Sequence, residues 1–75
     1  MNLSTAPEKR WLIVKKINLT DRNKLRLSQF GLNVGSRVMV IRKALFRDPL
    51  QIKIYGFFMS IRQKDADKII VEIEG

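Results

Sequence analysis

The sequence predicts a mainly β fold, and three observations lead to that prediction. Apolar and polar residues alternate in several short segments, as they do in strands with one buried face. Glycines and an Asp-Pro pair separate these segments, and a stretch with helix signals follows the first of them. The 75 residues allow one small domain, residues 1–75, in which residues 1–8 are expected to form a loosely ordered lead-in.

Strands are expected over residues 11–17, 37–41, 50–55, 57–62 and 69–73, with a turn at Tyr55-Gly56 and a helical turn over 64–68. The pattern is clearest where Leu50, Ile52 and Ile54 alternate with other residues. An open sheet of five short strands would leave exposed edges, whereas a closed barrel removes them and buries the alternating face. We therefore expect a small five-stranded SH3-like barrel with one inserted α-helix and a short helical turn before the last strand.

The inserted helix is expected over residues 21–30. Thr20 or Asp21 can cap its start, because their side-chain oxygens accept hydrogen bonds from amides that lack a partner in the first turn. Gly31 follows the helix, where a chain often enters the left-handed region that glycine visits at low cost. The residues expected to face the core are Leu25, Leu27 and Phe30.

The residue types exclude most catalytic and metal chemistry. The chain has no histidine and no cysteine, so only carboxylates remain as strong metal ligands. The acids near the C-terminus are expected to be solvated surface charges; they are Asp65, Asp67, Glu72 and Glu74. No histidine can serve as base for a serine nucleophile, and no phosphate-binding loop is present. We expect no catalytic residue, no cofactor, no metal site and no enzymatic activity.

The formal net charge of +8 indicates the kind of partner. Fifteen Lys and Arg residues stand against seven Asp and Glu residues, a balance that attracts nucleic acid, anionic lipid or an acidic protein surface. The N-terminus has no signal-peptide pattern, and no apolar run approaches the ~20 residues of a membrane-spanning helix. A cytoplasmic protein is expected, with the inner face of the membrane as a further location.

Two groups of residues are candidates for partner binding: Leu45, Phe46 and Arg47 in a loop, and Arg22, Lys24 and Arg26 on the helix. Phe46 either contacts a partner or plugs the end of the barrel, since a small core needs large side chains. The helix cations either form a solvated face or bind an acidic protein or an anionic membrane. Asp48-Pro49 is expected to be structural, with the aspartate accepting hydrogen bonds from neighbouring backbone amides.

Aromatic residues interleaved with cations favour an alternative function. Trp11, Tyr55 and Phe58 lie among Lys15, Lys53 and Arg62 in the sequence. Surfaces that bind single-stranded nucleic acid stack bases on aromatic rings while cations follow the phosphates. A basic nucleic-acid-binding barrel is therefore the alternative, although aromatic residues in a small barrel can also belong to the core.

The order and spacing of several short motifs resemble the FeoA family, whose members are small cytoplasmic accessory proteins of bacterial ferrous iron uptake. The motifs are Leu27-Ser28-Gln29-Phe30-Gly31-Leu32, Gly35-Ser36, Asp48-Pro49, Gly56 and Ile61-Arg62. The chain departs from the family pattern at Val34, where proline is usual, and at Leu45 and Arg47, where proline and glycine are usual. These departures predict a different shape for the loop over residues 45–49.

The resemblance implies a fold, a role and partners. The implied fold is the SH3-like barrel, and the implied role is to bind and regulate FeoB, a membrane ferrous transporter with a cytoplasmic GTPase domain. Related domains also occur at the C-terminus of some metal-dependent repressors. This chain carries no DNA-reading helix-turn-helix, which disfavours a repressor. Self-association through the apolar loop is a further expectation.

Overall fold

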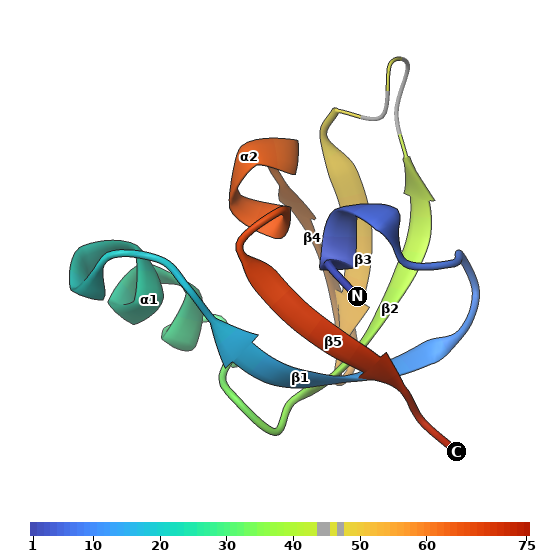
Figure 1. Ribbon diagram of the computed structural model, residues 1–75, viewed down its shortest axis with the longest axis horizontal. Coiled ribbons are helices and arrows are strands. Elements are labelled where there is room, and N and C mark those ends of the chain that lie inside the picture. Colours follow the sequence, from blue (N-terminus) through green and yellow to red (C-terminus); the bar gives the residue numbers. More distant parts are fainter. Residues whose placement is uncertain (44–45, 47) are drawn as a thin grey trace.

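The computed structural model describes residues 1–43, 46 and 48–75 (Figure 1). Its elements are η1 (Leu3–Thr5), β1 (Trp11–Ile17), α1 (Asp21–Ser28), β2 (Arg37–Lys43), β3 (Leu50–Ile54), β4 (Phe57–Ile61), α2 (Gln63–Ala66) and β5 (Ile69–Ile73). The strands form one antiparallel sheet in the order β4-β3-β2-β1-β5. The predicted mainly β class is confirmed, with the helix after the first strand and the helical turn before the last.

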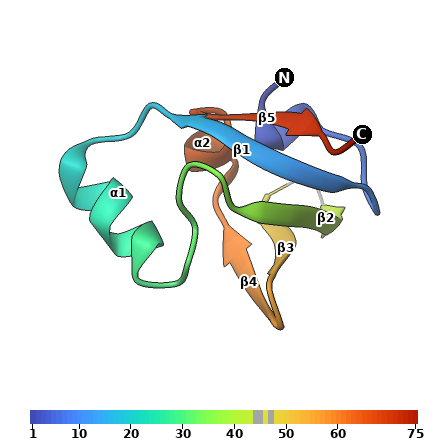
Figure 2. The same ribbon diagram turned by 90° about the horizontal axis from the view of Figure 1, so that it is seen from below.

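The sheet curls around a single apolar core. Figure 2 shows β1 and β5 on one side of the molecule and β3 and β4 on the other. The register shifts in β1 between Val14 and Lys16, and in β2 between Val40 and Arg42. Such β-bulges bend a strand and increase its twist, which allows five strands to wrap around their own inner face.

The core consists mainly of the alternating strand positions. The fully buried strand residues are Leu12, Val14, Val38, Val40, Leu50, Ile52, Ile54, Ile69 and Val71. The burial predicted from the alternation of Leu50, Ile52 and Ile54 is confirmed, because all three side chains have no exposed surface. Burying a side chain of this size stabilises the fold by about 1.5–3 kcal/mol, so these positions carry much of the folding free energy.

Helix α1 begins as the sequence predicts but contributes little to the core. Thr20 caps it by accepting a hydrogen bond from the Asn23 amide at 3.3 Å. Among its residues only Leu27 is buried, and the inward placement predicted for Leu25 and Phe30 is wrong. Two positions that lie two residues apart on a helix point in different directions, so Leu25 cannot share the inward face of Leu27.

The helix ends in a hydrogen-bonded turn that brings Gly31 against the sheet. The Leu32 amide donates to the Leu27 carbonyl at 3.1 Å, and the Gly31 amide donates to the Ser28 carbonyl at 3.0 Å. This pattern is a Schellman motif, in which glycine takes the left-handed conformation. Gly31 has a φ of 89°, and a Cβ there would lie 3.2 Å from the Tyr55 ring. The glycine predicted after the helix is therefore required both by its backbone and by its neighbour.

The N-terminal segment is packed against the sheet, which corrects the loose lead-in expected for residues 1–8. Leu3 and Ala6 are buried, and Asn2 forms a β-bridge with Ile70. The Val71 amide donates to the Met1 carbonyl at 2.8 Å, so the segment covers part of the β5 edge. Isolated apolar residues such as Leu3 give no periodic signal in a mostly polar segment. The sequence pattern therefore does not predict that this segment packs against the sheet.

The outer face of β1 carries an ion pair that connects its two neighbouring strands. Arg37 at the start of β2 donates two hydrogen bonds to Glu74, which follows β5, at 2.7 and 2.8 Å. The Arg37 guanidinium also lies 4.2 Å from the ring centroid of Trp11 on β1. The hydrogen bond from Arg37 lowers the pKa of the Glu74 carboxyl and raises the pKa of Arg37 itself. Bidentate pairs of this kind are stronger than single contacts between surface charges.

We expect Leu3→Ala to lower the free energy of unfolding by about 2–5 kcal/mol, because it empties a buried site that cannot fully collapse. Leu25→Ala is the matched control and should change stability by no more than about 0.5 kcal/mol, since that leucine is 62% exposed. Urea unfolding of both variants provides the measurement. Equal effects of the two substitutions would contradict the packing of the N-terminal segment.

We expect Glu74→Gln to make the free energy of unfolding fall less steeply as the pH is lowered. A carboxyl whose pKa is lowered in the folded state contributes stability above its unfolded pKa and loses it as the pH falls through the folded value. Urea unfolding between about pH 2 and pH 7 should therefore show a shallower loss for the variant than for the unmodified chain. Glu72→Gln, which removes a single contact at 3.6 Å to Lys15, serves as control. If both variants lose stability as steeply with falling pH as the unmodified chain, the Arg37–Glu74 pair does not contribute to the pH dependence of stability.

Candidate partner-binding surface

Phe46 is exposed in the connection between β2 and β3. Its residue surface is 88% accessible and its φ is 60°, in the left-handed region that bulky residues seldom adopt. The interpretation of Phe46 as a plug for the barrel end is therefore wrong. Leu45 and Arg47, the other two residues of this predicted contact, lie outside the described residues. Of these three residues only Phe46 is described, and its large apolar side chain is available to a partner.

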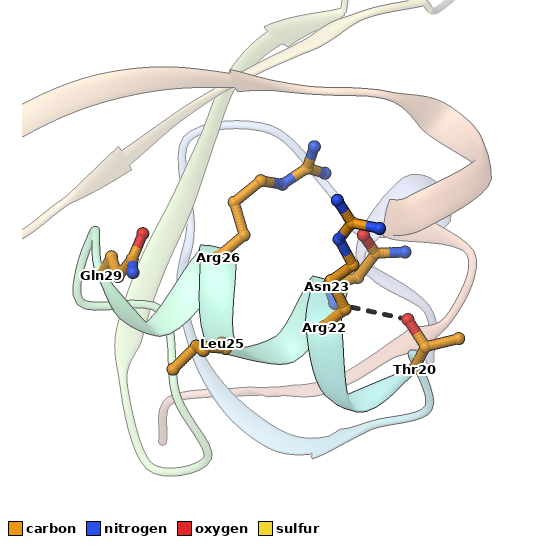
Figure 3. A pocket seen from close by; sticks show the side chains of 6 residues that line it. All are labelled: Thr20, Arg22, Asn23, Leu25, Arg26 and Gln29. Carbon is orange, nitrogen blue, oxygen red and sulfur yellow. Dashed lines mark hydrogen bonds between the residues drawn. The ribbon is translucent and has the colours of Figure 1, made fainter.

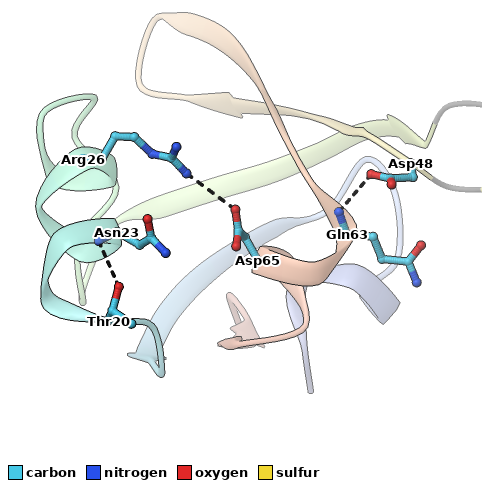
Figure 4. A network of polar contacts seen from close by, with 6 residues as sticks. All are labelled: Thr20, Asn23, Arg26, Asp48, Gln63 and Asp65. Atoms are coloured by element: carbon cyan, nitrogen blue, oxygen red, sulfur yellow. Dashed lines mark hydrogen bonds and ion pairs between the residues drawn. The ribbon is translucent and has the colours of Figure 1, made fainter.

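Asp48, which follows this loop, is structural as predicted, but it bonds a distant part of the chain. Its Oδ1 accepts a hydrogen bond from the Gln63 amide at 3.0 Å (Figure 4). Its Oδ2 lies 3.3 Å from Arg62 Nη2. The sequence predicted neighbouring amides as donors. The carboxylate instead accepts from the first amide of α2. That amide has no partner within the helix, and the helix dipole favours a negative charge at this end.

The structure divides the three predicted helix cations between two places. Figure 3 shows Arg22 and Arg26, one turn apart, projecting from the same side of α1, while Leu25 points to another side. Arg26 Nη2 also lies 3.6 Å from Asp65 Oδ2 on α2 (Figure 4). Lys24 lines a separate groove between α1 and β1. The predicted patch of Arg22, Lys24 and Arg26 is therefore not one continuous site.

All four C-terminal acids make a contact within the chain, but three remain exposed surface charges as expected, and only Asp65 departs from that expectation. Asp65 is only 13% exposed at its side chain and faces Arg26. Asp67 accepts a hydrogen bond from the Ser4 hydroxyl. Glu72 and Glu74 pair with Lys15 and Arg37, as described above. These contacts leave a surplus of cations on the surface for external anions.

An aromatic and cationic row crosses the outer face of the sheet. Phe58, Lys53, Met39 and Trp11 are cross-strand partners on β4, β3, β2 and β1. The Lys53 ammonium lies 6.0 Å from the Trp11 ring centroid and 5.9 Å from that of Phe58. Phe58 is 56% exposed, so it is not a core residue. The row brings together Trp11, Lys53 and Phe58 from the predicted aromatic and cationic set. Lys15, also in that set, lies elsewhere and lines the groove between α1 and β1.

Two exposed residues that line the groove between α1 and β1 are not among the predicted contacts. Val34 stands where proline is usual in the family pattern, and it is 65% exposed on the turn after α1. Lys16 falls within the strand predicted over residues 11–17, yet both it and Lys15 face solvent because of the bulge in β1. Two consecutive lysines between buried Val14 and Ile17 break the two-residue alternation, and that break is the signal that predicts a bulge.

In residues 1–43, 46 and 48–75 no cluster of three or more His, Cys, Asp and Glu side chains is placed to hold a metal ion. Within the same residues, no helix has both the length and the apolar character needed to cross a membrane.

Comparison with known proteins establishes the family. A family model, the FeoA domain, matches residues 1–73. The solution structure of FeoA from Chlorobium tepidum is 27% identical, with a TM-score of 0.93 over 100% of this chain and 71% of that one. Iron(II) transport protein A from Clostridium thermocellum is 25% identical, with a TM-score of 0.90 over 97% of this chain and 45% of that one. No curated protein matches the sequence.

A third structure identifies the fold type. FeoA from Stenotrophomonas maltophilia, crystallised with zinc and described as a prokaryotic SH3 domain protein, is 22% identical. Its TM-score is 0.78 over 96% of this chain and 89% of that one, which confirms the predicted SH3-like fold. Since the family model covers nearly the whole chain, this protein belongs to the FeoA family, which is associated with ferrous iron transport.

Proposed function

We propose that this protein is a cytoplasmic accessory and regulatory protein of ferrous iron uptake, which acts by binding an FeoB-type membrane transporter. Membership of the FeoA family supports the link to iron transport, and the resemblance noted in the sequence supports the transporter as partner. The observation that carries a binding role is the 88% exposure of Phe46, an apolar side chain that contributes nothing to the core. We propose no catalytic activity, cofactor or metal site for this protein.

The charge distribution supports an acidic partner surface. The chain has a net charge of +8, and Arg22 has no carboxylate within ion-pairing distance among the described residues. A basic surface raises the rate of encounter with an acidic protein and also draws the protein toward anionic lipid. Binding at the inner face of the membrane is therefore part of the proposal.

The aromatic and cationic row favours nucleic-acid binding as the second candidate. Phe58 and Trp11 present rings across four strands with Lys53 between them. This is the arrangement in which bases stack and phosphates meet cations. Against it, Arg37 already covers the Trp11 ring and is held by Glu74, so one of the two rings is occupied within the chain.

The test is binding of the purified protein to the transporter's cytoplasmic domain and, in parallel, to random single-stranded DNA, at low and moderate salt. We expect saturable transporter binding that persists at moderate salt, because an apolar contact is weakly screened. Phosphate binding by contrast weakens steeply with salt through counterion release. DNA binding without any transporter binding would favour the second candidate and overturn the first.

Two exposed phenylalanines provide matched variants for this test. We expect Phe46→Ala to weaken transporter binding by about fivefold or more, as truncation of a central apolar contact does, without lowering the melting temperature. Phe58→Ala should leave transporter binding unchanged and weaken any DNA binding. A fall in melting temperature for Phe46→Ala without a selective loss of affinity would rule out Phe46 as a contact.

A further inference from the structure

The groove between α1 and β1 combines exposed aliphatic side chains with a basic rim. Its volume is about 490 Å³. Ile17 and Leu32 lie at its buried base, while Leu25 and Val34 are 62% and 65% exposed. The charged groups along it are Lys15, Lys16, Lys24 and Asp21, so cations outnumber the single acid.

The lysines on β1 reach the groove because of the bulge in that strand. Val14 pairs with Val71 and Lys16 pairs with Ile70, so Lys15 is the extra residue. Val14 and Ile17 are buried, whereas both lysines between them are exposed. A regular strand would have turned one of the two lysines toward the core. The bulge therefore places two adjacent cations outside the core and on the same groove.

The turn after α1, which also lines the groove, is held by several hydrogen bonds. The Ser36 hydroxyl donates to the Gly31 carbonyl at 2.8 Å and accepts from the Asn33 amide at 2.9 Å. The Gly35 amide donates to the Val14 carbonyl at 2.8 Å, which ties the turn to β1. Val34 is thus displayed from a fixed backbone. A preorganised contact loses less conformational entropy on binding than a mobile one.

We propose that this groove binds an acidic peptide segment of a partner protein. An apolar side chain of the segment lies between Leu25 and Val34, and flanking carboxylates pair with Lys16 and Lys24. Charge complementarity selects this occupant: within the described residues no carboxylate lies within ion-pairing distance of Lys16 or Lys24, while Lys15 is only partly engaged by Glu72 at 3.6 Å. The same charge disfavours a second copy of this basic chain.

The inference deepens the proposed function and rests on it, because the partner that supplies the acidic segment is taken to be the transporter. It adds to the Phe46 contact a second region, formed by α1, β1 and the turn at Val34. Leu25 and Val34 are the apolar anchors, and the lysines select a partner segment with negative charge.

The first experiment is an NMR titration of the full chain with a synthetic peptide of two leucines flanked by glutamates. We expect saturable amide shifts around residues 15–17, 24–25 and 32–34. Leu25→Gln and Val34→Thr, which preserve helix propensity and side-chain shape respectively, should each weaken binding about tenfold. Phe58→Gln, an equally exposed apolar residue on the outer sheet face, is the matched control and should have no effect.

Three outcomes would overturn the proposal. A peptide in which serines replace the leucines could bind as well, which would leave charge alone as the cause. The shifts could lie outside the groove. Finally, vesicles with phosphatidylglycerol could bind through Lys16 and Lys24 while the peptide does not, which would assign the groove to lipid. We expect Lys24→Glu to weaken peptide binding and Lys64→Glu on α2, the matched control, to leave it unchanged; equal effects of the two would place the peptide outside the groove.

The transporter's cytoplasmic domain then separates this inference from the proposed function. Weaker binding of Leu25→Gln and Val34→Thr to that domain would support both. If the domain binds the unmodified chain and these variants equally, the groove proposal is overturned and the proposed function stands. If the peptide binds in the groove but the domain does not bind at all, the proposed function fails and the acidic-peptide site stands.

Discussion

The structure depends on how β1 is held between two other segments. Residues 11–13 pair with β2, but at Val14 the backbone bonds instead with the turn at Gly35 and Ser36, at 2.8 and 2.9 Å. Strand β5 runs along the other edge of β1 throughout. Both edges of β1 are therefore occupied over residues 11–14, which satisfies the backbone polar groups there while the inner face is buried. The position of α1 follows, since the chain must leave β1, form the helix and return to the same strand.

The small size of the chain explains why the surface carries so many exposed apolar side chains. A domain of this length can bury only a small core, which consists mainly of strand residues together with Leu3, Leu27 and Leu32. The large side chains of Phe46, Phe58 and Leu25 remain outside. They lie on three separate parts of the molecule, so one small barrel can contact partners on several sides.

Internal ion pairing determines which cations are available to a partner. The carboxylates of Asp48, Asp65, Glu72 and Glu74 each lie within 3.6 Å of a cationic nitrogen. These pairs connect elements that are distant in sequence, such as α1 with α2 and β2 with the end of β5. Since exposed pairs contribute little to stability, their main effect is on the distribution of charge. The cations that lack such partners then define the basic surface.

The sequence alone determined the strands, a helix start at Thr20 or Asp21, the glycine at the helix end and the class of fold. Each of these depends on local chemistry: side-chain alternation, capping oxygens and left-handed backbone all act within a few residues. Only the tertiary structure decided that Leu3 is buried, that Leu25 is exposed and that Asp48 bonds the first turn of α2. It also decided that Lys24 faces β1 rather than joining Arg22 and Arg26. These outcomes depend on which surfaces meet when the sheet curls, and neighbours in space are not neighbours in sequence.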